Sequence, residues 1–211
     1  MDLKGAVAIV TGGGTGIGRA VCLDLARAGA RGVVVNYSRS AADAEETAQR
    51  VAELGPEAVA PRAAVASDAA CREMVEAAVA RFGRLDVLVN NAGTTHLIAH
   101  PDLEAVTAEV WNDIVGVNLV GTFQCSRAAA AELRRARGAI VNVSSIAGWR
   151  PSGSSIPYAV SKAGLTQLTR LLARVLAPEV RVNSVSPGLV TTRWMSVSTG
   201  CHTPGSMSGY R

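Results

Sequence analysis

The chain has 211 residues, of which 48% are hydrophobic and only 4% aromatic, and its net charge at pH 7 is +4. This length suits one domain with a substantial core, and no apolar run is long enough for a membrane span or a signal peptide. The arginines are scattered without interleaved aromatic residues, which argues against a nucleic-acid interface. Cysteine and histidine spacing fits neither a disulfide framework nor a metal site, so we expect a reduced, cytoplasmic protein without metal.

Short runs of valine and isoleucine alternate along the chain with longer, alanine-rich amphipathic stretches. The expected strands are residues 6–10, 33–36, 58–65, 85–89, 139–143 and 180–185. The expected helices are residues 16–28, 41–54, 68–82, 109–135 and 158–176. Pro61 interrupts the third strand, which is typical of a sheet edge.

This alternation predicts βαβ units and therefore an α/β fold, a doubly wound, Rossmann-like parallel sheet with helices on both faces and strand order 3-2-1-4-5-6. Ligands bind such sheets at the carboxyl ends of the strands. We expect one domain over residues 1–194. Residues 195–211, rich in serine, glycine and threonine without a hydrophobic period, are expected to form an irregular tail.

A glycine-rich turn follows the first expected strand, with Gly12, Gly16 and Gly18 in the sequence from Thr11 onward. Glycines allow a tight turn and a close approach of backbone to a pyrophosphate, and the next helix directs its positive end at that anion. The spacing differs from Gly-x-Gly-x-x-Gly, and the lysine of a nucleoside-triphosphate loop is absent. A tight turn without a ligand is the alternative interpretation.

The loop after the second strand contains no acidic residue that would bind a ribose 2′-hydroxyl. Ser38 and Arg39 are instead suited to a 2′-phosphate, so we expect NADP in preference to NAD, which stays possible. A solvated loop arginine is the alternative for Arg39. The fourth strand ends in Asn90-Asn91-Ala92-Gly93, where asparagines bond neighbouring backbone and small residues leave room for a cofactor.

Tyr158 and Lys162 share one face at the start of the last expected helix. An ammonium beside a phenol lowers the phenol pKa, so the pair suits general acid–base catalysis. Ser145 follows the fifth strand, and its hydroxyl is expected to hold a substrate oxygen. The Tyr-x-x-x-Lys pattern is common in helices and gains meaning only beside the glycine-rich turn.

These motifs occur together in the order and spacing of one enzyme family. The segments are Thr11–Gly18, Asn90–Gly93, Asn118, Ser145, Tyr158-x-x-x-Lys162 and Pro187-Gly188. Over residues 4–194 the chain resembles the short-chain dehydrogenase/reductase family, in particular its 3-oxoacyl-carrier-protein reductase and glucose-dehydrogenase-like members. The resemblance implies an enzyme that transfers a hydride between NADP(H) and a small-molecule carbonyl or alcohol substrate.

The resemblance also implies roles for single residues. Tyr158 would protonate the carbonyl oxygen, Ser145 would polarise it, Lys162 would lower the Tyr158 pKa and bind the nicotinamide ribose, and Asn118 would support Lys162 through a water. Together with the turn and loop residues above, the expected cofactor site comprises Gly12, Thr15, Gly16, Ile17, Gly18, Ser38, Arg39, Val65, Asn91, Ala92, Gly93, Tyr158, Lys162, Pro187, Gly188 and Val190.

Three features depart from the family pattern. Ala64 stands where an acidic or amide residue often lies beside the adenine, and Gly14-Thr15 replaces a basic residue of some NADP-using members, which leaves Arg39 for the phosphate. The family usually continues past Thr192 through lid helices and a final strand, whereas this sequence ends at Arg211, so we expect a shortened C-terminus. A final strand would cover the sheet edge.

Two alternatives to an active enzyme remain open on these grounds. One is a catalytically silent, truncated nucleotide-binding protein, and the other is an assembly subunit of the same fold. The expected helices 109–135 and 158–176 would pair between subunits, as in family members, so we expect a homo-oligomer, dimer or tetramer. We expect no nucleic-acid partner and no membrane association.

Overall fold

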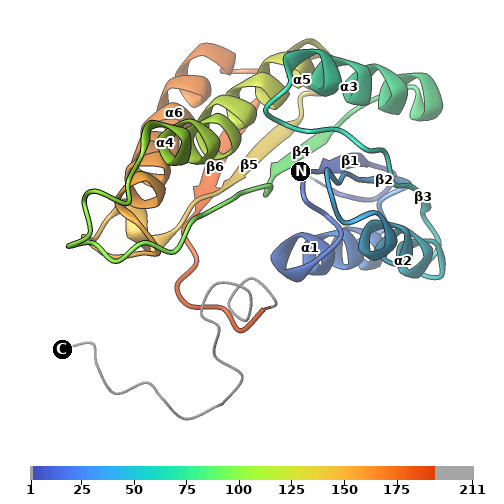
Figure 1. Cartoon of the computed structure of the whole chain (residues 1–211). Coiled ribbons are helices and arrows are strands. Elements are labelled where there is room, and N and C mark those ends of the chain that lie inside the picture. The colour runs from blue at the N-terminus through green and yellow to red at the C-terminus, as the bar shows by residue number, and fades with distance from the viewer. Residues whose placement is uncertain (1, 193–211) are drawn as a thin grey trace.

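A single parallel sheet organises residues 2–192, the part of the chain that the computed structural model describes. Its strands follow the order β3-β2-β1-β4-β5-β6, and every neighbouring pair is parallel (Figure 1). This confirms the predicted fold class and strand order. The strands are β1 (Val7–Val10), β2 (Gly32–Val35), β3 (Glu57–Val59), β4 (Val87–Asn90), β5 (Ala139–Val143) and β6 (Arg181–Val185).

Helices cover the sheet from both sides (Figure 1). One face carries α1 (Gly16–Arg27) and α2 (Ala41–Ala52). The other carries α3 (Asp68–Phe82), α4 (Ala108–Val115), α5 (Thr122–Ala136) and α6 (Ile156–Leu176). In Figure 1, α1 and α2 lie under β1, β2 and β3, whereas no labelled helix lies under β5 and β6.

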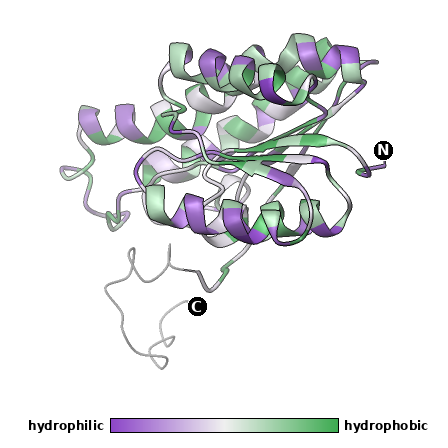
Figure 2. Ribbon diagram, turned by 90° about the vertical axis from the view of Figure 1, so that its right-hand side faces the viewer, coloured by the Kyte–Doolittle hydropathy of each residue, from purple (hydrophilic) through white to green (hydrophobic). Residues whose placement is uncertain are grey.

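Two hydrophobic clusters follow from the alternation of side chains along the strands. Val7 and Ile9 of β1 pack into the cluster beneath α3, α5 and α6, whereas Ala8 and Val10 pack into the cluster beneath α1 and α2. Because both faces are covered, β1 is buried along its whole length and reads as a continuous apolar run. Figure 2 shows these mainly hydrophobic strands between helices in which hydrophobic and hydrophilic residues alternate.

Two elements differ from the sequence-based expectation. The third strand ends at Val59, because Pro61 has no N–H to continue the ladder. The expected helix over residues 109–135 is divided by a π-helical segment, η1 (Gly116–Gly121), between α4 and α5. A short 3₁₀ turn, η2 (Ile146–Gly148), follows β5. Within residues 2–192, no helix combines the length and apolar character needed to cross a membrane.

Candidate active site

The glycine-rich turn connects β1 to α1 at the carboxyl edge of the sheet. Gly12 and Gly16 have φ values of +63° and +52°, in the left-handed region that favours glycine. A Cβ on Gly18 would overlap the carbonyl oxygen of Gly12, so the first turn of α1 packs directly on the backbone of the turn. The three predicted glycines therefore stand where no larger residue fits without strain or displacement.

The N-terminus of α1 has the properties of an anion site. Its N-cap, Thr15, makes no side-chain capping bond, and the first turn contains no acidic residue. The helix dipole therefore stays uncompensated where the chain turns towards the sheet edge. The glycines of the turn leave its backbone free of side chains, and the N-terminus of α1 has no capping side chain. A dinucleotide pyrophosphate can therefore approach both.

Hydrogen bonds made by the side chains of Thr11 and Asn91 hold the end of β4 against the glycine-rich turn. The Thr11 hydroxyl accepts hydrogen bonds from the backbone N–H groups of Asn91 and Ala92, at 3.0 Å each. The Asn91 side-chain amide donates to the carbonyl oxygens of Thr11 and Gly12, also at 3.0 Å. Asn91, predicted as a cofactor residue, thus holds the shape of the turn.

Ser38 and Arg39 lie exposed in the loop after β2, on the same edge of the sheet. Among residues 2–192, Arg39 makes no hydrogen bond or ion pair. Arg19, in the first turns of α1, is already engaged, because its guanidinium donates to the Gly14 carbonyl at 3.0 Å and pairs with Glu46 at 3.1 Å. Of these two arginines, Arg39 is therefore the one available to bind an anion.

Ser145, Tyr158 and Lys162 come together between β5 and α6. Helix α6 begins at Ile156, two residues before the predicted start, because the Ser155 side chain caps it by accepting from Tyr158 N–H at 3.4 Å. The side chains of Tyr158 and Ser145 are hydrogen-bonded. The Lys162 ammonium lies 5.8 Å from the centre of the Tyr158 ring. The structure thus unites the three predicted catalytic side chains.

The electrostatics of this group differ from the expectation. Burial raises the Tyr158 pKa, and the hydrogen bond with Ser145 only partly opposes that effect. Lys162 is 5% exposed, and burial lowers its pKa to about 8. Its ammonium donates to the Val143 carbonyl at 2.8 Å. The predicted lowering of the Tyr158 pKa is therefore wrong for this structure, because burial of the phenol dominates.

Asn118 is fully buried within η1 and ties three segments together. Its side-chain oxygen accepts from Thr94 N–H at 2.8 Å, and its amide donates to the Thr94 carbonyl at 3.1 Å and to the Ser161 hydroxyl at 3.0 Å. A Cβ on Gly93 would lie 3.4 Å from the Asn118 side-chain oxygen and 3.9 Å from the Lys162 nitrogen. The amide and the ammonium therefore flank the same glycine.

Sequence reasoning missed Thr94 and Ser161, the partners of Asn118. Ser161 donates in turn to the Tyr158 carbonyl at 2.7 Å, so Asn118 is linked to the first turns of α6. Only their positions next to the recognised motifs could have indicated a role, because Thr94 follows the Asn-Asn-Ala-Gly motif and Ser161 precedes Lys162. Neither residue type is distinctive at those positions.

The chain beyond β6 runs back over the carboxyl edge. The Pro187 carbonyl accepts from Ile146 N–H at 3.1 Å, and the Ile146 side chain lies 3.9 Å from where a Cβ on Gly188 would stand. Thr192 lies 3.5 Å from where a Cβ on Gly16 would stand. The segment containing the predicted residues Pro187, Gly188 and Val190 thus connects the catalytic group to the glycine-rich turn.

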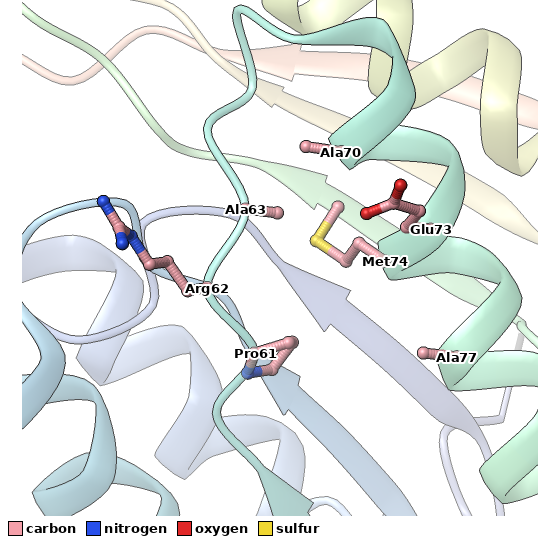
Figure 3. A pocket seen from close by; sticks show the side chains of 7 residues that line it. All are labelled: Pro61, Arg62, Ala63, Ala70, Glu73, Met74 and Ala77. Carbon is pink, nitrogen blue, oxygen red and sulfur yellow. The ribbon is translucent and has the colours of Figure 1, made fainter.

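A separate groove of about 200 Å³ lies between the segment after β3 and helix α3 (Figure 3). Pro61, Ala63, Ala70, Met74 and Ala77 give it an apolar lining, with Arg62 and Glu73 also beside it. It contains none of the predicted catalytic residues and no nucleophile. We therefore place the candidate active site at the carboxyl edge, not in this groove.

Comparison with known proteins identifies the family of the chain. The model of the short chain dehydrogenase family matches residues 6–199. A Streptomyces violaceoruber protein, named as ketoacyl reductase 2 of the granaticin polyketide synthase, is 53% identical over 89% of this chain and 74% of its own length. A Synechocystis 3-oxoacyl-[acyl-carrier-protein] reductase is 36% identical over 90% of this chain and 76% of its own length.

A solved structure extends the likeness to three dimensions. A short chain dehydrogenase from Burkholderia cenocepacia, in complex with NADP, matches with a TM-score of 0.86 and 36% identity over 92% of this chain and 78% of that chain. This chain thus spans about three-quarters of the length of these relatives. The fold, the family match and the relatives agree that the chain belongs to the short-chain dehydrogenase family of oxidoreductases, which use nicotinamide cofactors.

Proposed function

We propose that this protein reduces the ketone of a ketoacyl substrate with NADPH. The observation that carries the proposal is the convergence of Ser145, Tyr158 and Lys162 at the carboxyl edge that also holds the glycine-rich turn. The names of the Streptomyces and Synechocystis relatives support a ketoacyl substrate. The nicotinamide, when bound, supplies the hydride in reduction.

The proton chemistry belongs to the chain's own residues. Tyr158 would donate its hydroxyl proton to the carbonyl oxygen, while the Ser145 hydroxyl holds that oxygen in place. Because burial raises the Tyr158 pKa, the phenol stays protonated at neutral pH, as a proton donor must. Lys162, with a pKa of about 8, would retain its proton at neutral pH and orient the cofactor ribose.

The cofactor-facing residues are assigned in the same proposal. Gly12, Gly16 and Gly18 would admit the pyrophosphate to the N-terminus of α1. Ser38 and Arg39 would bind the 2′-phosphate, which favours NADP over NAD. The other residues expected to line the cofactor are Thr15, Ile17, Val65, Asn91, Ala92, Gly93, Pro187, Gly188 and Val190.

The test combines binding with turnover. Titration with NADPH and NADH, followed by nicotinamide fluorescence, should show saturable binding with a preference for NADPH. A ketoacyl thioester should then be reduced with loss of NADPH absorbance. Tyr158→Phe should lower kcat by about 10³-fold, within the range for loss of a general acid, and should change the NADPH Kd by far less.

Arg50→Gln, at an exposed position on α2 outside the proposed catalytic and cofactor residues, is the control and should retain kcat. If a folded protein binds NADPH but turns over no ketone, the silent nucleotide-binding protein becomes the better assignment. If it binds neither dinucleotide, the enzyme proposal fails.

We also propose a homo-oligomer formed through α5 and α6. The exposed apolar side chains Val120 and Phe123, on η1 and α5, and Leu171 and Val175, on α6, support pairing with a second copy. Sedimentation of the purified chain tests this, and a monomer at micromolar concentration would contradict it.

A further inference from the structure

The loop after β2 and the segment after β3 stay paired beyond the ends of both strands. Tyr37 N–H donates to the Pro61 carbonyl at 3.3 Å, Ala63 N–H donates to the Tyr37 carbonyl at 2.8 Å, and Tyr37 and Arg62 form an isolated parallel bridge. The buried Asn36 amide adds a bond to the Ala63 carbonyl at 3.0 Å. This pairing places Arg62 beside the loop predicted to bind the cofactor's adenosine end.

The Arg62 side chain is directed towards that loop. Its Nε donates to the Ser38 carbonyl at 3.2 Å, which holds the guanidinium beside Ser38, the residue that precedes Arg39 in the chain. Figure 3 shows the guanidinium pointing away from Glu73 and Met74, on the far side of the segment from the groove. The bond uses Nε, so the two terminal nitrogens stay available to donate elsewhere.

Arg62 also lacks the acidic partner that two arginines of α3 have. Arg72 pairs with Asp68, and Arg81 pairs with Glu57. Within residues 2–192, neither Arg62 nor Arg39 forms an ion pair. Two uncompensated cations held at one loop attract a doubly charged anion, and a guanidinium matches the geometry of phosphate oxygens.

From this geometry we propose that Arg62 is a second residue reading the 2′-phosphate of NADP, with the Ser38 carbonyl holding its guanidinium in position. The inference rests on the proposed use of NADPH. It differs from the sequence-based expectation, in which Arg39 alone was left for the phosphate. Arg62 would act on the choice between NADPH and NADH and not on the proton chemistry.

The experiment measures dissociation constants for NADPH and NADH, and for adenosine 2′,5′-bisphosphate and AMP as probes without nicotinamide. Arg62→Gln should weaken binding of NADPH and the bisphosphate by about tenfold, the effect of one charge-assisted contact, and change NADH and AMP by less than about twofold. Arg50→Gln, an exposed arginine on α2, is the control for net charge and should change no constant. Added salt should weaken NADPH binding more in the wild type than in Arg62→Gln, because exposed charges are screened.

Each contrary result has a distinct meaning. If the wild type prefers NADPH and Arg39→Gln loses that preference while Arg62→Gln retains it, the proposal for Arg62 is wrong and the NADPH assignment stands. Equal weakening of NADPH and NADH by Arg62→Gln would also overturn it, because that pattern indicates a disturbed loop. If the wild type binds neither dinucleotide or prefers NADH, the proposed NADPH function and this inference fail together.

Discussion

The two halves of the sheet build the candidate site by different means. On the β1–β3 side, the site consists of backbone, glycines and exposed cations, with Gly18 packed on the Gly12 carbonyl. On the β4–β6 side, it consists of buried polar side chains such as Asn118 and Lys162, each bonded to other segments. Substitutions that add atoms should therefore destabilise the β1–β3 half most, and substitutions that remove atoms should destabilise the β4–β6 half most.

The largest effect should come from an added methyl group in the first half. Gly18→Ala places a Cβ against the Gly12 carbonyl and 2.6 Å from the Asn91 side-chain nitrogen, and backbone gives way less easily than a flexible side chain. We expect a loss of more than about 3 kcal/mol in the free energy of unfolding, measured with urea, and loss of dinucleotide binding.

Gly116→Ala is the matched control, because a Cβ at Gly116 meets no atom within 4 Å. It should leave stability unchanged or slightly increased. Equal effects of the two substitutions would contradict the view that close backbone packing constrains the cofactor half.

Removal of atoms should be most costly at Asn118. Asn118→Ala leaves the Thr94 N–H, the Thr94 carbonyl and the Ser161 hydroxyl without this partner inside the protein. We expect a loss of about 2 to 3 kcal/mol in denaturant unfolding, together with reduced kcat. Asn112→Ala, at an exposed position on α4, should change stability by less than about 0.5 kcal/mol. A near-neutral Asn118→Ala would show that water replaces the amide without cost.

The smallest predicted change has the opposite sign. Burial lowers the Lys162 pKa from 10.5 to about 8, so keeping the ammonium charged at pH 7 costs the folded state about 3 kcal/mol. Lys162→Met removes that cost but also the bond to the Val143 carbonyl. We expect a net gain of about 1 to 2 kcal/mol in unfolding free energy at pH 7, with loss of activity.

The pH dependence gives this prediction its control. Between pH 8 and 10 the unfolded chain holds the Lys162 proton more tightly than the folded one, so wild-type stability should rise with pH. Lys162→Met should lack this contribution. Above pH 10 the raised Tyr158 pKa acts in the opposite direction, because ionisation then favours the unfolded chain. Parallel pH profiles for the two proteins would contradict a lowered Lys162 pKa.

Local patterns predicted the sheet, its order and most helices, because strand runs, glycines and proline act over a few residues. They also predicted which side chains meet at the carboxyl edge, since parallel strands end there together. The bond from Lys162 to the Val143 carbonyl and the position of Arg62 beside Ser38 depend on pairing between distant segments. The spacing of residues along the sequence does not predict such contacts. The direction of the Tyr158 pKa shift also depends on this packing, because packing decides how far the phenol is buried.

The π-helical segment at Gly116–Gly121 determines which sides of α4 and α5 face their neighbouring helices. A π turn contains an extra residue relative to an α turn, and each residue turns the helix by about 100°. The face that α5 directs at α3 is therefore out of phase with the face that α4 directs at α6. The continuous helix formed by α4, η1 and α5 therefore packs against α6 at one end and α3 at the other. Deleting a residue of η1 would rotate α5 about its axis and change the side chains that contact α3.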